Sequence, residues 1–120
     1  MKKSENIVVL DRWDDGSPKV ETIDSSNNKI IKISYYKNGI INTKESMVSN
    51  IRSGPYQRFW ENGKKWDETF FLDGKEHGPT TLYTEDGTIW LKGEYRHGKK
   101  IGKWVFHDPN GDIARIEEFE

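Results

Sequence analysis

The sequence predicts an all-β protein, a single-domain antiparallel meander of β-hairpin repeats with a 24-residue period. The first observation is a set of turn dipeptides that recur every 24 residues: Asn38-Gly39, Asn62-Gly63, Asp86-Gly87 and Asn110-Gly111. The second is that aromatic and apolar residues follow the same period, in columns such as Tyr35, Phe59, Tyr83, His107 and Met47, Phe71, Tyr95, Phe119. The third is the lack of any long helical periodicity between these signals.

Each repeat is expected to form one β-hairpin. Asn-Gly and Asp-Gly pairs between apolar segments are strong hairpin signals, because these residues adopt a positive φ readily. We expect a strand of about six residues to enter each turn and one of about eight to leave it. The stretch 73–78 holds a second Xaa-Gly pair and is expected to reverse the chain into the next unit. Glycines recur at the end of these reversals, at Gly54, Gly78 and Gly102.

The first part of the chain is less regular than the rest. We interpret residues 1–29 as a degenerate capping hairpin, because Asp15-Gly16 precedes Asn38-Gly39 by 23 residues instead of 24. Within it, the segment DSSNN, residues 24–28, is expected to be a loop. The regular repeats then follow at 30–53, 54–77, 78–101 and 102–120.

The composition is polar but indicates a folded protein. Charged residues make up 32% of the 120 residues, yet the chain holds 5 Trp, 5 Tyr and 5 Phe, whereas disordered segments are poor in aromatic residues. The net charge is -1; residues 1–60 carry 10 Lys and Arg against 7 Asp and Glu, and residues 61–120 carry 9 against 13. This balance provides no field that would attract nucleic acid or an acidic membrane.

The absence of cysteine excludes disulfides, thiolate metal sites and a cysteine nucleophile, and it suits a reducing cytoplasm. The apolar run 7–10 near the N-terminus is shorter than the core of a signal peptide, which needs about 7–15 residues. No apolar run approaches the roughly 20 residues of a membrane span. We therefore expect a cytoplasmic protein.

Motifs for catalysis or for cofactors are not convincing. His77, His97 and His107 lack the spacing of a metal site, and we interpret them as surface or packing residues. The segment DPNGD, residues 108–112, alternates oxygen ligands but forms a better turn than a calcium loop. The basic segment RHGKKIGK, residues 96–103, lacks the spacing of a phosphate loop. We expect no catalytic residue, no metal and no cofactor.

The repeat resembles a known family in the segments TTLYTEDGTIWLKGEYRHGKKIG, residues 80–102, and GKWVFHDPNGDIARIEEFE, residues 102–120. Both are similar to the variant MORN repeat of bacterial proteins that are often labelled YwqK-type antitoxins, and the resemblance extends over residues 30–120. It implies a β-hairpin architecture and no catalytic residues. This chain departs from the pattern at Thr80, where Tyr56 and Trp104 stand in other repeats, and at the segment SNIRSG, residues 49–54.

An aromatic stripe is the candidate binding surface. A two-residue turn at Asn62-Gly63 would pair Phe59 with Trp66, and its counterpart would pair Tyr83 with Trp90. One face of the sheet would then hold the predicted partner-binding residues Tyr35, Phe59, Trp66, Tyr83 and Trp90. Exposed aromatic patches often mark partner sites. The alternative is that this stripe and the one on the opposite face are both core residues, enclosed by curvature of the sheet.

These observations predict a non-enzymatic module that binds a protein. The resemblance implies a more concrete function: an antitoxin or immunity protein that neutralises a cognate bacterial toxin by direct binding. Its alternative is a structural scaffold or an envelope-associated repeat protein without a toxin partner. A more remote alternative is a binder of lipid or carbohydrate that uses the aromatic stripe.

Overall fold

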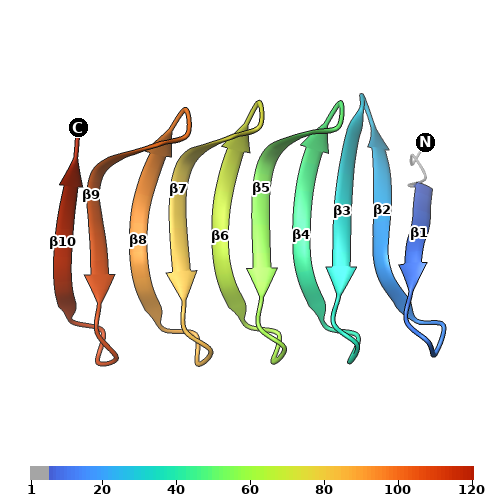
Figure 1. Ribbon diagram of the computed structural model, residues 1–120, viewed down its shortest axis with the longest axis horizontal. Helices are drawn as coiled ribbons and strands as arrows, with labels where there is room; N and C mark the ends of the chain where they lie inside the picture. The colour runs from blue at the N-terminus through green and yellow to red at the C-terminus, as the bar shows by residue number, and fades with distance from the viewer. Residues whose placement is uncertain (1–5) are drawn as a thin grey trace, which may run out of the picture.

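The computed structural model describes residues 6–120, and these form one ten-stranded antiparallel sheet in which every strand pairs with its neighbours in sequence (Figure 1). The predicted all-β meander is therefore confirmed. The strands are β1 (Asn6–Arg12), β2 (Pro18–Ser26), β3 (Lys29–Tyr35), β4 (Ile41–Val48), β5 (Ile51–Phe59), β6 (Lys65–Leu72), β7 (Lys75–Tyr83), β8 (Ile89–Arg96), β9 (Lys99–His107) and β10 (Ile113–Phe119).

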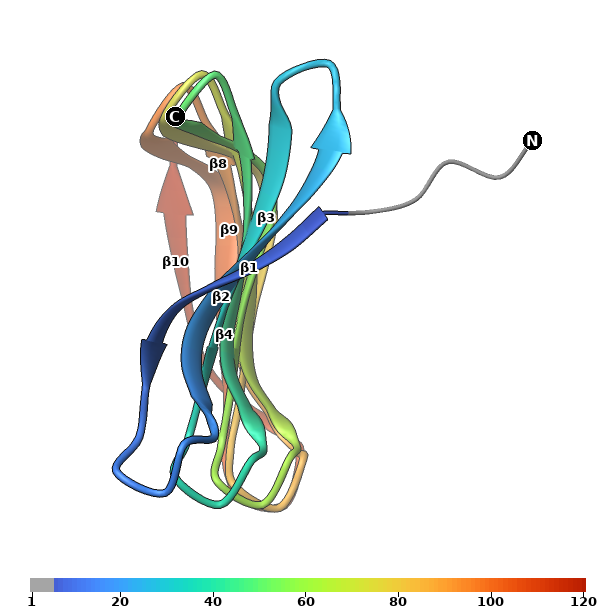
Figure 2. The ribbon, with the colours of Figure 1, turned by 90° about the vertical axis from the view of Figure 1, so that its right-hand side faces the viewer.

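The sheet is a single layer. Seen from its β1 edge, the strands lie behind one another without a second sheet or a helix across either face (Figure 2). None of the described residues forms a helix, so no helix that could cross a membrane is found among them. Because a single layer cannot enclose its side chains, few residues are buried: the hydrophobic Ile33, Leu91 and Trp104 and the polar Asp67 and Thr80.

The Asn-Gly turns lie at the lower edge of Figure 1 and are longer than two residues. In the loop of β5–β6, the Trp60 N–H donates to the Lys64 carbonyl at 2.8 Å, and the Gly63 N–H donates to the Trp60 carbonyl at 2.9 Å. Phe59 then pairs with Lys65, and a β-bulge follows. The predicted pairing of Phe59 with Trp66 is therefore wrong.

The same bulge occurs in the next hairpin, where Tyr83 pairs with Ile89. The predicted pairing of Tyr83 with Trp90 is wrong for the same reason. In each hairpin the bulge places one extra residue in the strand that follows the five-residue loop. A shift of one residue changes the face of the sheet on which a side chain lies.

The reversals at the opposite edge are two-residue turns. Asp73 and Gly74 have φ values of 50° and 86°, and they join the paired residues Leu72 and Lys75. Two positive φ values are typical of a type I′ turn. The expected reversal over 73–78 is thus shorter, and Gly78 lies inside β7 beside a bulge, with φ 114°.

The expected loop 24–28 and the irregular segment 49–54 also contain such turns. Asn27-Asn28 joins β2 to β3, and Ser49-Asn50 joins β4 to β5, with positive φ at all four residues. Asparagine tolerates this conformation because its short side chain bonds locally to the backbone. The segments 24–28 and 49–54 are therefore mostly strand, and their departure from the Xaa-Gly pattern leaves the hairpin geometry unchanged.

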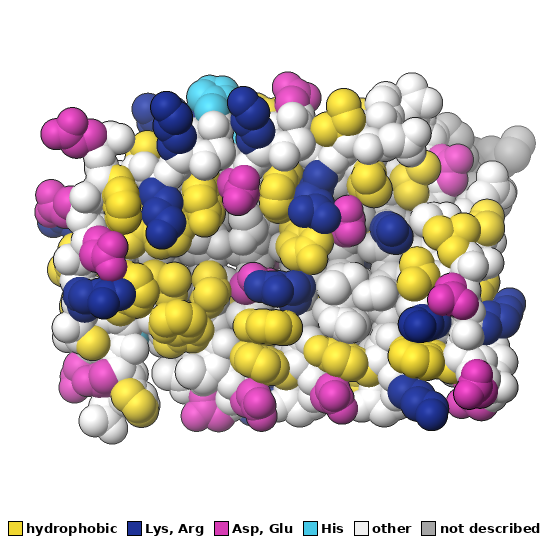
Figure 3. Space-filling view, in the orientation of Figure 1, with side chains coloured by type: hydrophobic (Ala, Val, Ile, Leu, Met, Phe, Trp, Pro, Cys, Tyr) yellow, Lys and Arg dark blue, Asp and Glu magenta, His cyan; other side chains and the backbone are white. Residues whose placement is uncertain are grey.

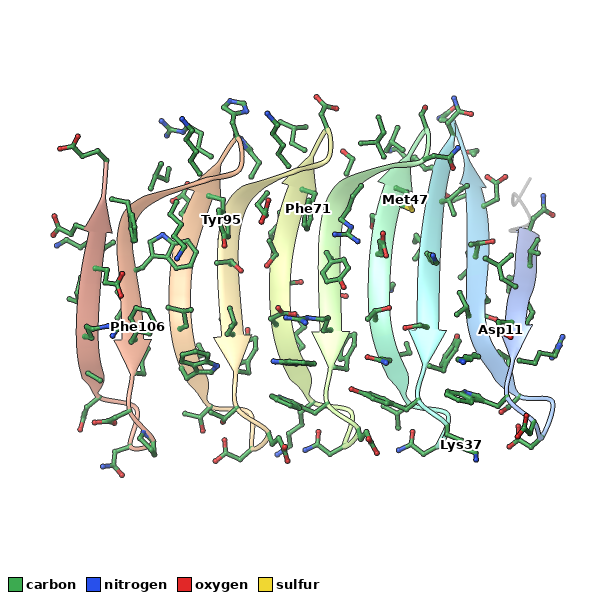
Figure 4. The ribbon with its side chains drawn as sticks, viewed as in Figure 1. Asp11, Lys37, Met47, Phe71, Tyr95 and Phe106 are labelled. Atoms are coloured by element: carbon green, nitrogen blue, oxygen red, sulfur yellow. The ribbon has the colours of Figure 1, made fainter. Side chains whose placement is uncertain are left out.

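One face carries rows of aromatic side chains with cations over their rings. Met47, Phe71 and Tyr95 follow one row across β4, β6 and β8, as Figure 4 shows. The Arg52 guanidinium lies 4.9 Å from the centre of the Phe71 ring, and the Lys100 ammonium lies 4.7 Å from that of Trp104. In Figure 3 hydrophobic and basic side chains alternate over this face. The cations cover rings that a second layer would otherwise cover.

Trp104 occupies the best-packed position on this face. Its indole makes edge contacts with Tyr95 and Phe119, at centroid distances of 5.0 and 6.2 Å. Gly93 lies beneath the indole, where a Cβ atom would come within 3.0 Å of the ring. Thr80 holds the same repeat position in β7, and its hydroxyl bonds the Thr69 hydroxyl at 2.6 Å. The missing ring at Thr80 is thus replaced by a buried hydroxyl pair.

Candidate binding groove at the loop edge

The predicted stripe is divided between the two faces of the sheet. The Arg58 guanidinium lies 4.1 Å from the centre of the Trp66 ring, so Trp66 is on the face of Arg58. Phe59 follows Arg58 in β5, and its side chain therefore points to the opposite face. Tyr35 is also on that opposite face, where its O–H donates to Glu21. The expectation that all five stripe residues share one face is wrong.

Tyr35 and Phe59 are half-buried and are already engaged within the sheet. Desolvation, followed by the hydrogen bond to Glu21, raises the pKa of Tyr35 to about 12. The backbone carbonyl of Phe59 accepts a hydrogen bond from the Tyr36 O–H at 2.6 Å. These contacts tie the Tyr35 side chain and the Phe59 backbone to neighbouring residues of the sheet.

The other three stripe residues, Trp66, Tyr83 and Trp90, all line one cavity of about 580 Å³. Tyr83 follows Leu82 in β7 as Phe59 follows Arg58 in β5, so its side chain points to the face of Phe59 and it borders the cavity from the strand. We call this cavity the loop groove; it lies at the Asn-Gly edge of the sheet, beside the loops 84–88 and 108–112. Its aromatic lining is Trp60, Trp66, Tyr83, Trp90 and His107, and its acidic lining is Glu85, Asp86 and Asp108. Trp90 is 37% exposed.

One wall of the loop groove is a stack of planar groups from a single hairpin, β5–β6. The Trp60 and Trp66 rings are stacked, with centroids 4.6 Å apart and an angle of 20°. The Arg58 guanidinium covers the Trp66 ring, and it donates two hydrogen bonds to Asp67, at 2.9 and 2.6 Å. The hydrogen bonds to Asp67 raise the pKa of Arg58.

The next hairpin, β7–β8, keeps only part of this stack. Trp90 corresponds to Trp66, but Thr84 stands at the position of Trp60 and Leu82 at that of Arg58. Among the rings of residues 6–120, only that of Phe106 pairs with Trp90, tilted and 6.1 Å away. The loop groove is therefore the space that a ring at position 84 would fill.

A ladder of loop hydrogen bonds also ends at the groove. The Asn38 side-chain amide donates to the Glu61 carbonyl at 3.2 Å, and that of Asn62 donates to the Glu85 carbonyl at 2.8 Å. The next position is Asp86, whose carboxylate has no N–H to donate. Consequently the loop 84–88 cannot bind its neighbour 108–112 in this way, and the space between them stays open.

The charge of the groove lining is negative. Asp86 accepts hydrogen bonds from the Thr84 hydroxyl and from the hydroxyl and N–H of Thr88, at 2.8 and 3.1 Å for Thr88. These bonds, that of Thr84 first, lower the pKa of Asp86 to about 2. Neither lysine nor arginine is among the described lining residues. Lys64 lies nearby, and its ammonium donates to the Asp86 backbone carbonyl at 3.1 Å.

Sequence reasoning missed Trp60 and the three carboxylates of the groove. A signal was present in the column Tyr36, Trp60, Thr84, Asp108, in which the ring is lost after the second of the four regular repeats. No cluster of three or more His, Cys, Asp or Glu that could hold a metal is found in the part of the chain that the structure describes. The arrangement offers ring faces and negative charge, which suits binding.

Comparison with known families gives one match. Residues 52–73, which span most of the β5–β6 hairpin, match the family described as MORN repeat variant. Comparison with curated proteins and with solved structures finds no match. The matched hairpin is the one that carries the complete Arg58–Trp66–Trp60 stack, and antiparallel hairpins recur along the whole sheet. The match supports a MORN-repeat protein.

Proposed function

We propose that this protein is a non-enzymatic module that binds another protein through the loop groove. The observation that carries the proposal is the cavity of about 580 Å³ with the exposed indole of Trp90 in its lining. Aromatic residues at the centre of a concave patch dominate binding energies in protein interfaces, because large rigid rings bury much area and lose little entropy. The MORN repeat match supports a repeat protein with a binding role.

The concrete form of the proposal is an antitoxin or immunity protein that occludes a cognate bacterial toxin. Its support is the resemblance of the repeats to YwqK-type antitoxins. Inhibition by occlusion requires a complementary surface and does not require reactive groups on the inhibitor. The loop groove supplies such a surface with both apolar and charged parts.

A second candidate is a scaffold that associates through the edges of its sheet. Large apolar side chains are exposed on the two outer strands: Ile7, Val8 and Leu10 on β1, and Ile113 and Ile116 on β10. Open edges with apolar side chains are templates for pairing with another strand. Because β1 and β10 run in opposite directions in Figure 1, copies side by side would continue the antiparallel order.

Co-expression with the product of the neighbouring gene tests the antitoxin proposal. We expect the full chain to restore growth to cells that express a toxin from the adjacent reading frame, and to copurify with it. Trp90→Ala should weaken this complex at least tenfold, whereas the edge variant Ile116→Ala should leave it unchanged. A complex that is weakened only by Ile116→Ala would favour the scaffold, and loss of growth rescue with the unmodified chain would contradict the antitoxin role.

A further inference from the structure

We propose that the loop groove receives an arginine side chain of a partner protein, with the guanidinium stacked on Trp90 and paired with the groove carboxylates. The inference rests on the proposed protein-binding function and specifies the chemistry of the partner. It follows from three observations. One hairpin contains a stack of planar side chains, the next hairpin lacks two members of that stack, and the residues around the resulting space are acidic.

The hairpin β5–β6 shows how an arginine fits this architecture. Arg58 lies flat over Trp66, with the guanidinium carbon 4.1 Å from the ring centre, and it bonds both oxygens of Asp67. A guanidinium favours this combination because it is planar and because its N–H groups match a carboxylate. The repeat therefore already contains one indole–arginine–carboxylate unit.

The hairpin β7–β8 keeps the indole of this unit without its arginine or its carboxylate, because Leu91 stands at the position of Asp67. The acidic residues of the groove lie instead in the loops beside it. Trp90 keeps the place of Trp66, while the positions of Trp60 and Arg58 hold the smaller Thr84 and the neutral Leu82. The ring surface that these changes uncover faces the cavity of about 580 Å³. A flat group from another molecule can therefore stack on Trp90, as Trp60 stacks on Trp66.

The charge of the groove selects a cationic flat group. Glu85, Asp86 and Asp108 line it, and the hydrogen bonds of Thr84 and Thr88 keep Asp86 ionised. The Lys64 ammonium donates to the Asp86 backbone carbonyl, and the Asp108 carboxylate accepts the N–H groups of Asn110 and Asp112. Within residues 6–120, none of the three groove carboxylates forms a salt bridge. A neutral ring would fill the space but leave these charges unpaired. A lysine would pair with them but has no flat surface for the indole.

Binding of short blocked peptides to the full chain tests the inference. The probes are acetyl-Gly-Arg-Gly-amide and the same peptide with lysine or with citrulline, which is planar but neutral. Indole N–H signals in NMR spectra report binding, since a single anchored side chain gives dissociation constants on the order of a millimolar. We expect the arginine peptide to shift the Trp90 signal and to bind about tenfold more tightly than the citrulline peptide, with lysine in between.

Variants of the groove make the test specific. Thr84→Trp restores the ring that the other hairpin has at this position. The protein should therefore stay folded and bind the arginine peptide at least tenfold more weakly. Trp90→Ala should have the same effect on binding. Asp108→Asn should weaken binding a few-fold, whereas the matched control Glu118→Gln removes an exposed carboxylate on β10 and should change nothing.

Equal affinity for the arginine and citrulline peptides would overturn the inference, and so would unchanged binding to Trp90→Ala. If Thr84→Trp fails to fold, these two comparisons decide the question alone. The toxin complex separates this inference from the proposed function. A toxin complex that survives Thr84→Trp refutes the arginine site and leaves protein binding intact. Peptide binding without any complex supports the site and contradicts the antitoxin role.

Discussion

Trp104 and Trp90 lie on adjacent strands of the same sheet but in opposite environments. Trp104 on β9 is 3% exposed and is surrounded by Tyr95, Phe119 and the Lys100 ammonium. Trp90 on β8 is 37% exposed and has one tilted ring beside it. In a sheet without a second layer, the neighbouring side chains on the same face alone decide whether an indole is covered.

The residues at neighbouring positions account for this difference. Trp104 lies over Gly93, whose missing side chain makes room for the indole. Thr84 has the opposite effect on Trp90, because it stands where the preceding hairpin has the ring of Trp60 and so leaves the Trp90 indole uncovered. One small residue thus creates the core and another creates the groove. Substitutions at these positions should therefore have very different consequences for stability.

We expect Trp104→Ala to have the largest effect on stability. It removes the main buried side chain of an already small core and uncovers Tyr95 and Phe119, which should lower the free energy of unfolding by about 3–5 kcal/mol. Urea denaturation followed by circular dichroism measures this loss. A loss below about 1 kcal/mol would show that the cluster around Trp104 contributes little and would remove the basis of the comparison.

Gly93→Ala should come next. The added Cβ would lie within 3.0 Å of the Trp104 ring atoms, and an indole held on several sides cannot move away freely. Overpacking of this kind costs about 1–3 kcal/mol. The double variant Gly93→Ala, Trp104→Ala provides the control, since without the indole the added methyl group should cost much less. Additive effects of the two substitutions would refute the steric explanation.

The order of the strands could be predicted from the sequence because the 24-residue period of the turn dipeptides fixes it. The face of the sheet on which each aromatic side chain lies could not be predicted in this way. The Asn62-Gly63 pair does not reveal that its loop has five residues, and the resulting bulge moves Trp66 away from Phe59. Side chains alternate between the two faces of a strand, so a shift of one residue reverses the faces. The sequence therefore predicted the strands correctly but placed the stripe residues on the wrong faces.

The residues of the groove could be predicted from the sequence only in part, for a related reason. Trp66, Tyr83 and Trp90 were identified, since aromatic residues are conspicuous in a polar chain. The vacancy at Thr84 and the end of the asparagine ladder at Asp86 are differences between repeats, and they acquire meaning only when neighbouring loops are seen side by side. Sequence periodicity describes what the repeats share, whereas the groove arises where they differ.

Tyr35 should show a pH effect that separates it from the groove residues. Its pKa is raised to about 12 in the folded protein, against an ordinary value of 10.0, because burial and Glu21 favour the protonated phenol. The resulting contribution to stability is complete below pH 10 and is lost as the pH rises toward 12. Ultraviolet titration of wild type and Tyr35→Phe measures it. A phenol that ionises near pH 10 would show that Tyr35 is free, as a partner-binding residue of the predicted stripe would be.

Trp90→Ala should have the smallest effect on folding and a large effect on binding. Its indole is 37% exposed and has one tilted ring beside it, so we expect the free energy of unfolding to change by about 1 kcal/mol or less. The loss of an aromatic anchor should weaken a protein complex by about 2 kcal/mol or more. Thermal melting and titration with the partner measure the two effects on the same sample. If Trp90→Ala instead destabilised the fold as strongly as Trp104→Ala, Trp90 would belong to the core, and the loop groove would be a packing defect without a role in recognition.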